Sequence, residues 1–476
     1  MGDDHSAAAG ARADARLAHC APMFTPETLE VVMVSFEGPD QYSQAGGLGV
    51  RARELCRGLA AAGFRTTLAF VGDPEKPEED EDQGVHLLRW CQELSRRSPN
   101  GVYQGEYTKI AELSRTLPGH LITHVIRPAA TQGRVVAVLS EEWHTTAFVR
   151  VLSDRLHANG LRDRAVLLWN ANNLFGFDGI DWGPLNFVAS VTTVSRYMKH
   201  LMWPHGVNPV VIPNGIPETA LRPVDAGAVR AIRSAAGTPC LAFKIGRFSP
   251  DKRWHQAVAA IAELRSEGLP ARLVMRGGIE PFGAEVIAFA RSVGLRVTDW
   301  HDPVEDAGGV VRALVDTDGA PVVHLRRFLP DQVIAELNCA ATTVLANSRH
   351  EPFGLVGLEA MAAGGVAMVG ATGEEYARPY GNAIVVETED PAEVASAMRG
   401  LVEQPALARR LRAAARRDAA DFAWPIVIAG LLARLRFMCL HQRVQLPAAD
   451  TGTPVRLRRP AAGSRPRGSA AAAASG

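Results

Sequence analysis

Short apolar runs alternate with amphipathic segments along most of the 476-residue chain. The runs are mostly near-continuous stretches of Leu and β-branched residues, which are typical of strands buried on both faces of a parallel sheet. A first set of predicted strands covers residues 31–36, 66–71, 85–89, 121–126, 135–139, 165–169, 191–194 and 210–212. A second set covers residues 241–245, 272–275, 296–299, 322–325, 343–346, 366–369 and 384–386.

Helical periodicity fills the segments between these runs. After the first strand, for example, Leu48, Leu55 and Leu59 fall on one helical face. Repeated strand–helix units indicate an α/β protein with parallel, doubly wound sheets. Because the strands are more numerous than one sheet usually holds, we expect two Rossmann-like domains facing across a cleft. Ligands bind beyond the carboxyl ends of such strands, so the site is expected between the domains.

Changes in composition indicate where these domains begin and end. We expect a disordered N-terminal segment over residues 1–26 and a first domain over residues 27–220. A Pro-, Gly- and Ala-rich stretch at 216–239 separates the two sets of strands, so the second domain is expected over residues 221–420. Residues 446–476 are rich in Ala, Pro and Arg and lack the apolar residues of a core, so we expect a disordered tail.

The charge balance excludes one broad class of partner. Lys and Arg number 51, as do Asp and Glu, and a net charge of zero gives no overall attraction to nucleic acid. The six cysteines are scattered without CxxC pairs, and the N-terminus lacks the apolar segment of a secretory signal. No stretch approaches the ~18 uninterrupted apolar residues of a membrane span. We therefore expect a cytoplasmic protein.

A glycine-rich turn, Gly46-Gly47-Leu48-Gly49, follows the first predicted strand and opens a helix. Glycines let a ligand approach the backbone, and a helix N-terminus offers free N–H groups and partial positive charge. The turn therefore suits a phosphate. Taken alone, a tight turn without any ligand explains the same glycines at least as well.

A second turn carries Arg247 and Lys252, after the predicted strand at 241–245. A guanidinium and an ammonium about five residues apart can grip a diphosphate from two sides. Each charge-assisted hydrogen bond contributes about 1.5–3 kcal/mol. Exposed charges are common in such loops, so this motif alone leaves a structural reading equally open.

A third motif extends from Glu351 to Glu359. Gly354 interrupts regular structure and a helix is predicted over residues 355–363, so Glu351 lies in a loop and Glu359 inside the helix. Backbone N–H groups near Gly354 can face a diphosphate. The two carboxylates can then accept hydrogen bonds from sugar hydroxyls on either side, although a helical Glu is more often solvated.

Together these motifs resemble the retaining nucleotide-sugar glycosyltransferases of the glycogen-synthase and family-4 type, which have the two-domain GT-B fold. The resemblance covers about residues 29–440. The segments that carry it are GGLG (46–49), SEEWHTT (140–146), TTVSRY (192–197), VIPNGI (211–216), GRFSPDKRW (246–254), EPFGLVGLEAMAAG (351–364) and DFAW (421–424). Their order agrees with the strand–helix alternation, which chance would not produce.

The resemblance implies a role for each matched residue. The catalytic residues would be Arg247, Lys252 and Glu351, the cations holding the departing diphosphate and Glu351 contacting the transferred sugar. The implied donor-binding residues are Gly46, Gly47, Asn172, Phe353, Gly354, Leu355 and Glu359. The first domain would take the acceptor, the second the nucleotide-sugar, and a helix over residues 421–445 would cross back to the first domain.

The implied activity is transfer of a hexosyl unit from a nucleotide-diphospho-sugar to an acceptor hydroxyl with retention of anomeric configuration. The resemblance implies no metal and no cofactor, since cations and a helix N-terminus can stabilise the departing charge. The spacing of Asp316 and Asp318 is that of a metal-binding DxD motif, but a polar turn explains it better. The acceptor, whether glycan, small molecule or lipid-linked compound, stays open.

Three features leave alternative interpretations of the function open. Family members commonly carry a His where this chain has Asn172, which cannot titrate, so a catalytically silent sugar-nucleotide sensor or scaffold is the alternative function. His144 is a second first-domain imidazole, which we expect to be hydrogen-bonded or exposed. The Arg-rich C-terminal region suits an anionic membrane, although a solvated helix and tail are favoured.

Overall fold

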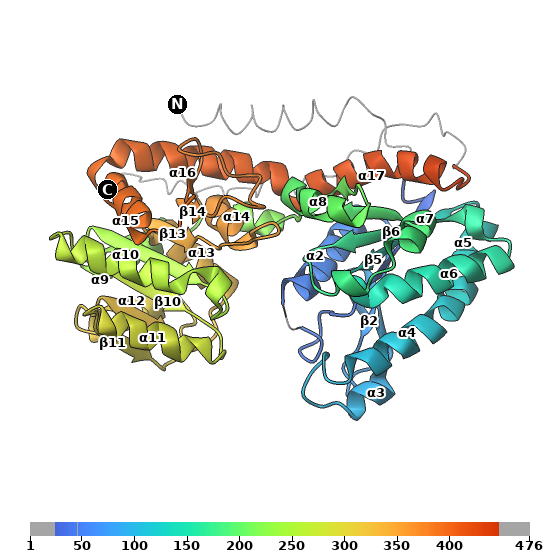
Figure 1. Ribbon diagram of the computed structural model, residues 1–476, viewed down its shortest axis with the longest axis horizontal. Coiled ribbons are helices and arrows are strands. Elements are labelled where there is room, and N and C mark those ends of the chain that lie inside the picture. The colour runs from blue at the N-terminus through green and yellow to red at the C-terminus, as the bar shows by residue number, and fades with distance from the viewer. Residues whose placement is uncertain (1–23, 45, 447–476) are drawn as a thin grey trace, which may run out of the picture.

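The computed structural model describes residues 24–44 and 46–446, so the terminal segments expected to be disordered lie almost entirely outside the described residues. The chain forms two α/β domains, each built on a mostly parallel sheet flanked by helices (Figure 1). Buried runs of β-branched residues and Leu supply most strands of both sheets. The prediction of two Rossmann-like, doubly wound domains is confirmed.

The first domain holds an eight-stranded sheet with the order β3-β4-β2-β1-β5-β6-β7-β8, in which only β3 and β4 pair antiparallel. Its strands are β1 (Leu29–Val34), β2 (Arg65–Val71), β3 (Glu79–Asp82), β4 (Val85–Trp90), β5 (Val135–Glu141), β6 (Ala165–Ala171), β7 (Ser190–Thr193) and β8 (Val210–Val211). Its helices are α2 (Gly47–Ala61), α3 (Gln92–Arg96), α4 (Glu106–Leu121), α5 (Arg127–Thr131), α6 (Thr146–Ala158), α7 (Trp182–Val188) and α8 (Arg196–Met202).

The second domain holds a seven-stranded parallel sheet with the order β11-β12-β10-β9-β13-β14-β15. Its strands are β9 (Cys240–Ile245), β10 (Ala271–Arg276), β11 (Val297–Trp300), β12 (Val322–Leu325), β13 (Thr343–Ala346), β14 (Ala367–Val369) and β15 (Ile384–Val385). Its helices are α9 (Ala226–Ala236), α10 (Trp254–Ser266), α11 (Phe282–Ser292), α12 (Ala307–Asp316), α13 (Asp331–Ala340), α14 (Leu355–Ala362), α15 (Pro391–Glu403) and α16 (Pro405–Ala419).

Two predicted segments differ from the structure. Residues 121–126 are helical, because α4 continues through the π-helical turn Ile122–Ile126. Their β-branched run favours a strand locally, but buried residues at 113, 117, 121 and 126 continue one helical face. The acidic run at residues 74–82 is, by its composition, predicted to be a solvated loop, but it contains the edge strand β3, whose charged residues bond to Arg57, His86 and Arg89. Charged side chains on an edge strand prevent pairing with another chain.

The strand order reverses at one point in each sheet, between β1 and β5 and between β9 and β13. In open α/β sheets a ligand binds outside the carboxyl ends of the strands at such a reversal. The loops that leave these four strands carry Gly46, Glu142, Lys252 and Glu351. The topology therefore brings the predicted motifs to the expected edge of each sheet.

The chain crosses between the domains twice, and the two crossings pair with each other. The backbone N–H of Ile216 donates to Phe422 O at 2.9 Å, and Trp424 N–H donates to Ile216 O at 3.0 Å. After the second crossing, α17 (Trp424–His441) packs against α2 and β6, along the top of the first domain in Figure 1. Of the helices in the described ranges, α17 alone is long and apolar enough to cross a membrane, but Leu431 and Leu435 are buried in the core of the first domain.

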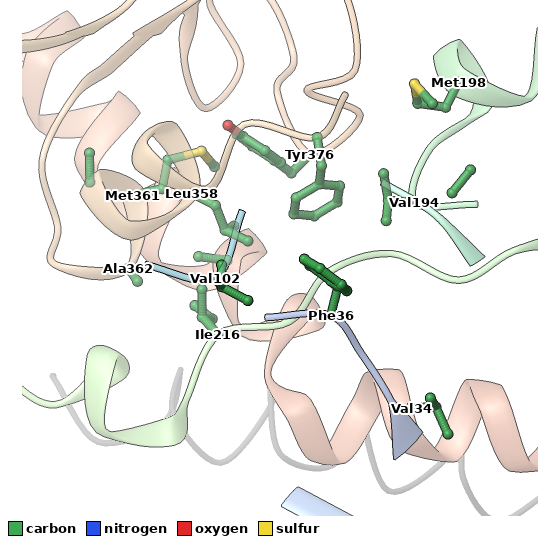
Figure 2. Close-up of a cluster of buried hydrophobic side chains, with 14 of the residues drawn as sticks. Val34, Phe36, Val102, Val194, Met198, Ile216, Leu358, Met361, Ala362 and Tyr376 are labelled. Carbon is green, nitrogen blue, oxygen red and sulfur yellow. The ribbon is translucent and has the colours of Figure 1, made fainter. Parts of the chain in front are cut away.

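One buried hydrophobic cluster extends through both domains (Figure 2). Its labelled side chains include Phe36, Val102, Val194 and Met198 from the first domain and Leu358, Met361 and Tyr376 from the second. Apolar packing therefore continues across the junction and holds the two sheet edges toward each other.

Candidate functional site

Lys252 and Glu351 form an ion pair at the strand-order reversal of the second domain. Lys252 ends the turn Pro250–Lys252 after β9, and Glu351 lies in the loop after β13. The Lys252 Nζ donates a hydrogen bond of 2.6 Å to Glu351 Oε2, and an Asp251 oxygen lies 3.7 Å from the same ammonium. Both side chains of the pair are 22% exposed, so a ligand can reach them. Two of the three residues predicted to be catalytic are thus in direct contact.

Arg247 lies on the same loop as Lys252 and is exposed. Its carbonyl accepts a hydrogen bond of 2.8 Å from Trp254 Nε1, and the next backbone N–H, of Phe248, donates to Glu280 at 2.9 Å. Within the described part of the chain, no hydrogen bond or ion pair engages the guanidinium of Arg247. The loop backbone is therefore fixed while this cation stays available for an anion.

The loop before α14 presents backbone amides beside Glu351. Gly354 has a φ of +81°, and a Cβ at this position would lie 2.7 Å from Glu374 Cγ, so glycine is required there. The first N–H groups of α14, beginning at Leu355, need partners from outside the helix. The Phe353 ring is 2% exposed and packs on the rings of Tyr376 and Phe422, so it stabilises the loop instead of facing a ligand.

One further carboxyl group in this region has a raised pKa value. Burial raises the pKa of Glu374 to about 8, and the charge of Glu351 adds to the rise. One Glu374 oxygen accepts a hydrogen bond from the Thr372 hydroxyl at 3.1 Å, and the other has no partner among the described residues. The Glu359 side chain, on α14, is exposed to solvent. Glu374 lies outside the predicted motifs.

In the first domain, the Glu37 carboxylate lies at the N-terminus of α2. Its Oε2 accepts hydrogen bonds from Gly46 N at 2.9 Å and from Gly49 N at 3.1 Å, and its Oε1 accepts one from the Tyr103 hydroxyl. A carboxylate is favourable at the positive end of a helix. Gly46 and Gly47 are exposed, so a phosphate can reach them, but one negative group already lies beside them.

Asn172 joins two consecutive glutamates at the ends of β5 and β6. Its Nδ2 donates to Glu141 Oε2 at 2.6 Å, and its backbone N–H donates to Glu142 Oε1 at 2.6 Å. Glu141 also lies 3.3 Å from Arg51 Nε. Burial raises the pKa of Glu142 to about 8, and the charge of Glu141 adds to the rise. Asn172 therefore orients carboxylates that the sequence analysis did not select.

His144 is neither hydrogen-bonded nor exposed, so the expectation for this residue was wrong. Its ring stacks on Phe36 and Trp143, with centroid distances of 4.4 and 4.1 Å. Neither ring nitrogen has a hydrogen-bond partner in the described part of the structure, and the nearest carboxylate, Glu106, lies 3.8 Å from Nε2. Burial lowers the pKa of His144 to about 4, so the ring is neutral at pH 7.

The first and second domains touch through loops next to the predicted residues. The Tyr197 hydroxyl lies 2.9 Å from His350 Nδ1, and Arg196 N–H donates to the Glu375 carboxylate. His350 directly precedes Glu351, so α8 contacts the loop that carries the ion pair. The predicted residues thus form two groups on facing edges, and among the described residues no hydrogen bond joins Lys252 or Glu351 to the first-domain group.

No group of three or more His, Cys, Asp or Glu side chains in the described ranges is arranged to hold a metal ion. In the DxD segment, the Thr317 hydroxyl donates to Ala313 O at 2.7 Å and accepts a hydrogen bond from Arg272 at 3.1 Å. These bonds hold the turn between α12 and β12.

Family models and curated relatives match most of the chain. Residues 45–219 match Glycosyltransferase Family 4, and residues 317–418 match Glycosyl transferases group 1. A D-inositol 3-phosphate glycosyltransferase from Nocardioides sp. is 31% identical over 422 residues, which cover 80% of this chain and 82% of the relative. A GDP-mannose-dependent alpha-(1-6)-phosphatidylinositol dimannoside mannosyltransferase from Mycobacterium tuberculosis is 28% identical over 50% of this chain and 54% of the relative.

Solved structures share the fold at lower identity. The catalytic domain of starch synthase IV from Arabidopsis thaliana, bound to ADP and acarbose, superimposes with a TM-score of 0.63 at 15% identity, covering 87% of this chain and 99% of that chain. Alignments to some of the other curated relatives span about half of those proteins or less.

Proposed function

The chain belongs to the glycosyltransferases of family 4 and group 1, and we propose from this premise that it transfers a hexosyl unit from a nucleotide-diphospho-sugar to an acceptor hydroxyl with retention of configuration. One relative is named as GDP-mannose-dependent, and another is named for D-inositol 3-phosphate. These names support a nucleotide-sugar donor, and they leave the nucleotide, the sugar and the acceptor of this chain open.

The observation that carries the proposal is the Lys252–Glu351 ion pair on the same loop as Arg247, whose guanidinium has no partner among the described residues. A bound diphosphate can take the place of Glu351 at the Lys252 ammonium and accept further hydrogen bonds from Arg247. Glu351 is then free to accept a hydrogen bond from a hydroxyl of the donor sugar. The pair thus keeps both groups partnered in the empty enzyme and offers both to the donor.

In the proposed reaction, the bond between the anomeric carbon and the diphosphate oxygen breaks as the acceptor oxygen bonds to the same face of that carbon. The acceptor proton passes to the departing phosphate oxygen. Negative charge grows on the diphosphate, and cations fixed in place before the reaction stabilise it. Arg247, Lys252 and the N-terminus of α14 supply this stabilisation in our proposal, without a divalent metal.

The test is the Arg247→Ala/Lys252→Ala double variant. Each lost charge-assisted bond is expected to cost about 1.5–3 kcal/mol, or about 10- to 150-fold in kcat/KM. The double variant should therefore fall below detection in a radiolabelled donor assay, while Arg291→Ala, an exposed arginine on α11, stays at the wild-type level. Wild-type turnover by the double variant contradicts the assignment.

Two further measurements separate the finer parts of the proposal. The product's anomeric proton coupling in NMR should match that of the donor, and activity should survive chelation of divalent metals with EDTA. A product with the opposite anomeric configuration would contradict retention, and loss of activity on chelation would contradict transfer without a divalent metal. Donor binding without turnover across a panel of donors and acceptors would instead favour the silent sensor.

A further inference from the structure

A group of polar atoms in the first domain is buried without hydrogen-bond partners among the described residues. It consists of one carboxylate oxygen of Glu142, the side-chain oxygen of Asn172 and both ring nitrogens of His144. The Glu142 and His144 side chains are 1% and 5% exposed. Buried polar groups in native proteins are nearly always paired, so a cluster of unpaired ones indicates a site completed by a ligand.

The backbone at Glu142 is strained. Its φ of +67° is unusual for a residue with a side chain. Hydrogen bonds hold it in place, because Glu142 N donates to Asn170 O and Glu142 O accepts from Trp169 Nε1, both at 2.9 Å. Strain that the surrounding structure maintains in this way is typical of ligand-binding positions.

Exposed aromatic rings lie around these atoms. Tyr107 is 73% exposed and Phe175 is 72% exposed. The Tyr107 ring lies 6.0 Å from that of Trp143, and a Cβ at Gly176 would lie 2.5 Å from Trp143, so the loop that carries Phe175 packs closely on this ring. Aromatic faces next to polar groups suit a polyol, whose C–H faces pack on rings while its hydroxyls bond to polar atoms.

The charges in this region are mostly negative. The carboxylates are those of Glu37 and Glu106, which lie near Tyr103, and of Glu141, which lies near Glu142. The Arg51 guanidinium already bonds to Glu141 and Asn214, and the buried Lys109 ammonium donates to Tyr42 and to the Val102 carbonyl. His144 is neutral at pH 7. Among the described residues of this region, a phosphate group on the ligand would therefore meet carboxylates without a free cation to pair with.

We propose that Glu142, His144 and Asn172, with the aromatic rings beside them, form the acceptor subsite and that the acceptor is an uncharged polyol, a sugar or cyclitol without phosphate. This inference rests on the proposed glycosyl transfer. One acceptor hydroxyl donates to the free Glu142 oxygen, and another bonds to a ring nitrogen of His144. The acceptor reaches them by displacing the side chains of Tyr103 and Glu106, which adjoin the His144 ring.

The experiment compares paired acceptors that differ only in a phosphate: myo-inositol with D-inositol 3-phosphate, and glucose with glucose 6-phosphate. With the full chain and its best donor, the unphosphorylated member of each active pair should have the higher kcat/KM, by at least about tenfold. Higher activity with the phosphorylated members overturns the inference. Donor hydrolysis without acceptor is measured in parallel, and its absence with every donor, together with absence of transfer, contradicts the glycosyl transfer itself.

Variants then locate the subsite. Glu142→Gln should lower kcat/KM for the acceptor by at least about tenfold and change donor hydrolysis by less than about twofold. Glu336→Gln is the matched control, because Glu336 is also buried with an unpaired oxygen but lies on α13 of the second domain.

Tyr107→Ala and Phe175→Ala alter exposed rings only and should raise the acceptor KM by about fivefold. If Glu142→Gln loses transfer and donor hydrolysis equally, the acceptor binds elsewhere. The same conclusion follows if both ring variants keep the wild-type acceptor KM.

Discussion

Two glutamates at the facing domain edges have pKa values near neutrality. The pKa is raised to about 8 for Glu142 and Glu374, mainly because burial disfavours the charged form. Near pH 7 such groups hold a proton for much of the time and can donate hydrogen bonds as well as accept them. Carboxyl groups of this kind are suited to ligands rich in hydroxyls.

Glu374→Gln tests this at one residue. In the folded chain Glu374 keeps its proton up to about pH 8, whereas in the unfolded chain it loses it near pH 4.5, so the free energy of unfolding falls as pH rises between these values. Over two pH units within this window, the wild type should lose about 2 kcal/mol more stability than Glu374→Gln. Denaturant melts at pH 5.5 and 7.5 measure the difference, and parallel curves for the two proteins contradict the raised pKa.

At the scale of single residues, the sequence predicts which residues belong to the motifs but not which side chains contact them. The contact between Lys252 and Glu351 follows from two loops leaving adjacent strands, so the spacing of motifs along the chain was sufficient. Glu142 and Glu374 become conspicuous only through burial and unpaired oxygens, which depend on side chains brought in from distant segments. His144 was misjudged for the same reason, since its stacking on Phe36 joins residues far apart in the sequence.

At the scale of elements, the strands could be predicted because most have a continuous apolar run. The helical segment 121–126 could not, because six residues give no period, and the continuation of a buried face from Leu113 and Leu117 becomes visible only over several turns. The acidic strand β3 could not be predicted either, since pairing with β4, and not its composition, makes it a strand.

The packing of α17 on α2 depends on a small residue at their contact. A Cβ on Gly58 of α2 would lie 2.7 Å from Ile428 Cδ1 and 3.3 Å from Trp424 Cβ. Gly58→Leu should therefore overpack this contact and cost about 1–3 kcal/mol, lowering Tm by several degrees. Gly400→Leu on α15 is the control, because a Cβ there meets nothing within 4 Å. Differential scanning calorimetry measures both, and an equal Tm for the two variants argues against the contact.

At the scale of the molecule, the sequence predicts two facing domains but not how they touch. The contacts of Tyr197 with His350 and of Arg196 with Glu375 join residues more than 150 positions apart, and no local pattern marks them. They connect α8 to the loops next to Glu351 and Glu374. The relative position of the domains therefore bears directly on where these carboxylates lie.

Tyr197→Phe tests this connection. Removing the hydroxyl deletes one exposed hydrogen bond between the domains, worth about 0.5–1.5 kcal/mol. Because the bond favours the arrangement that brings both halves of the site together, the donor KM should rise about two- to tenfold while Tm changes little. Tyr380→Phe, at an exposed tyrosine of the second domain, should leave KM unchanged. Steady-state kinetics measure the donor KM of both variants. A wild-type donor KM in Tyr197→Phe would show that this contact does not affect donor binding.

The paired crossings at Ile216 and Trp424 have a mechanical consequence. A single connecting segment would let one domain rotate about several axes relative to the other. Two connecting segments joined by backbone hydrogen bonds instead favour rotation about one axis and resist twisting. Rotation about that axis would change the separation of Lys252 and Glu142 without twisting one domain edge against the other.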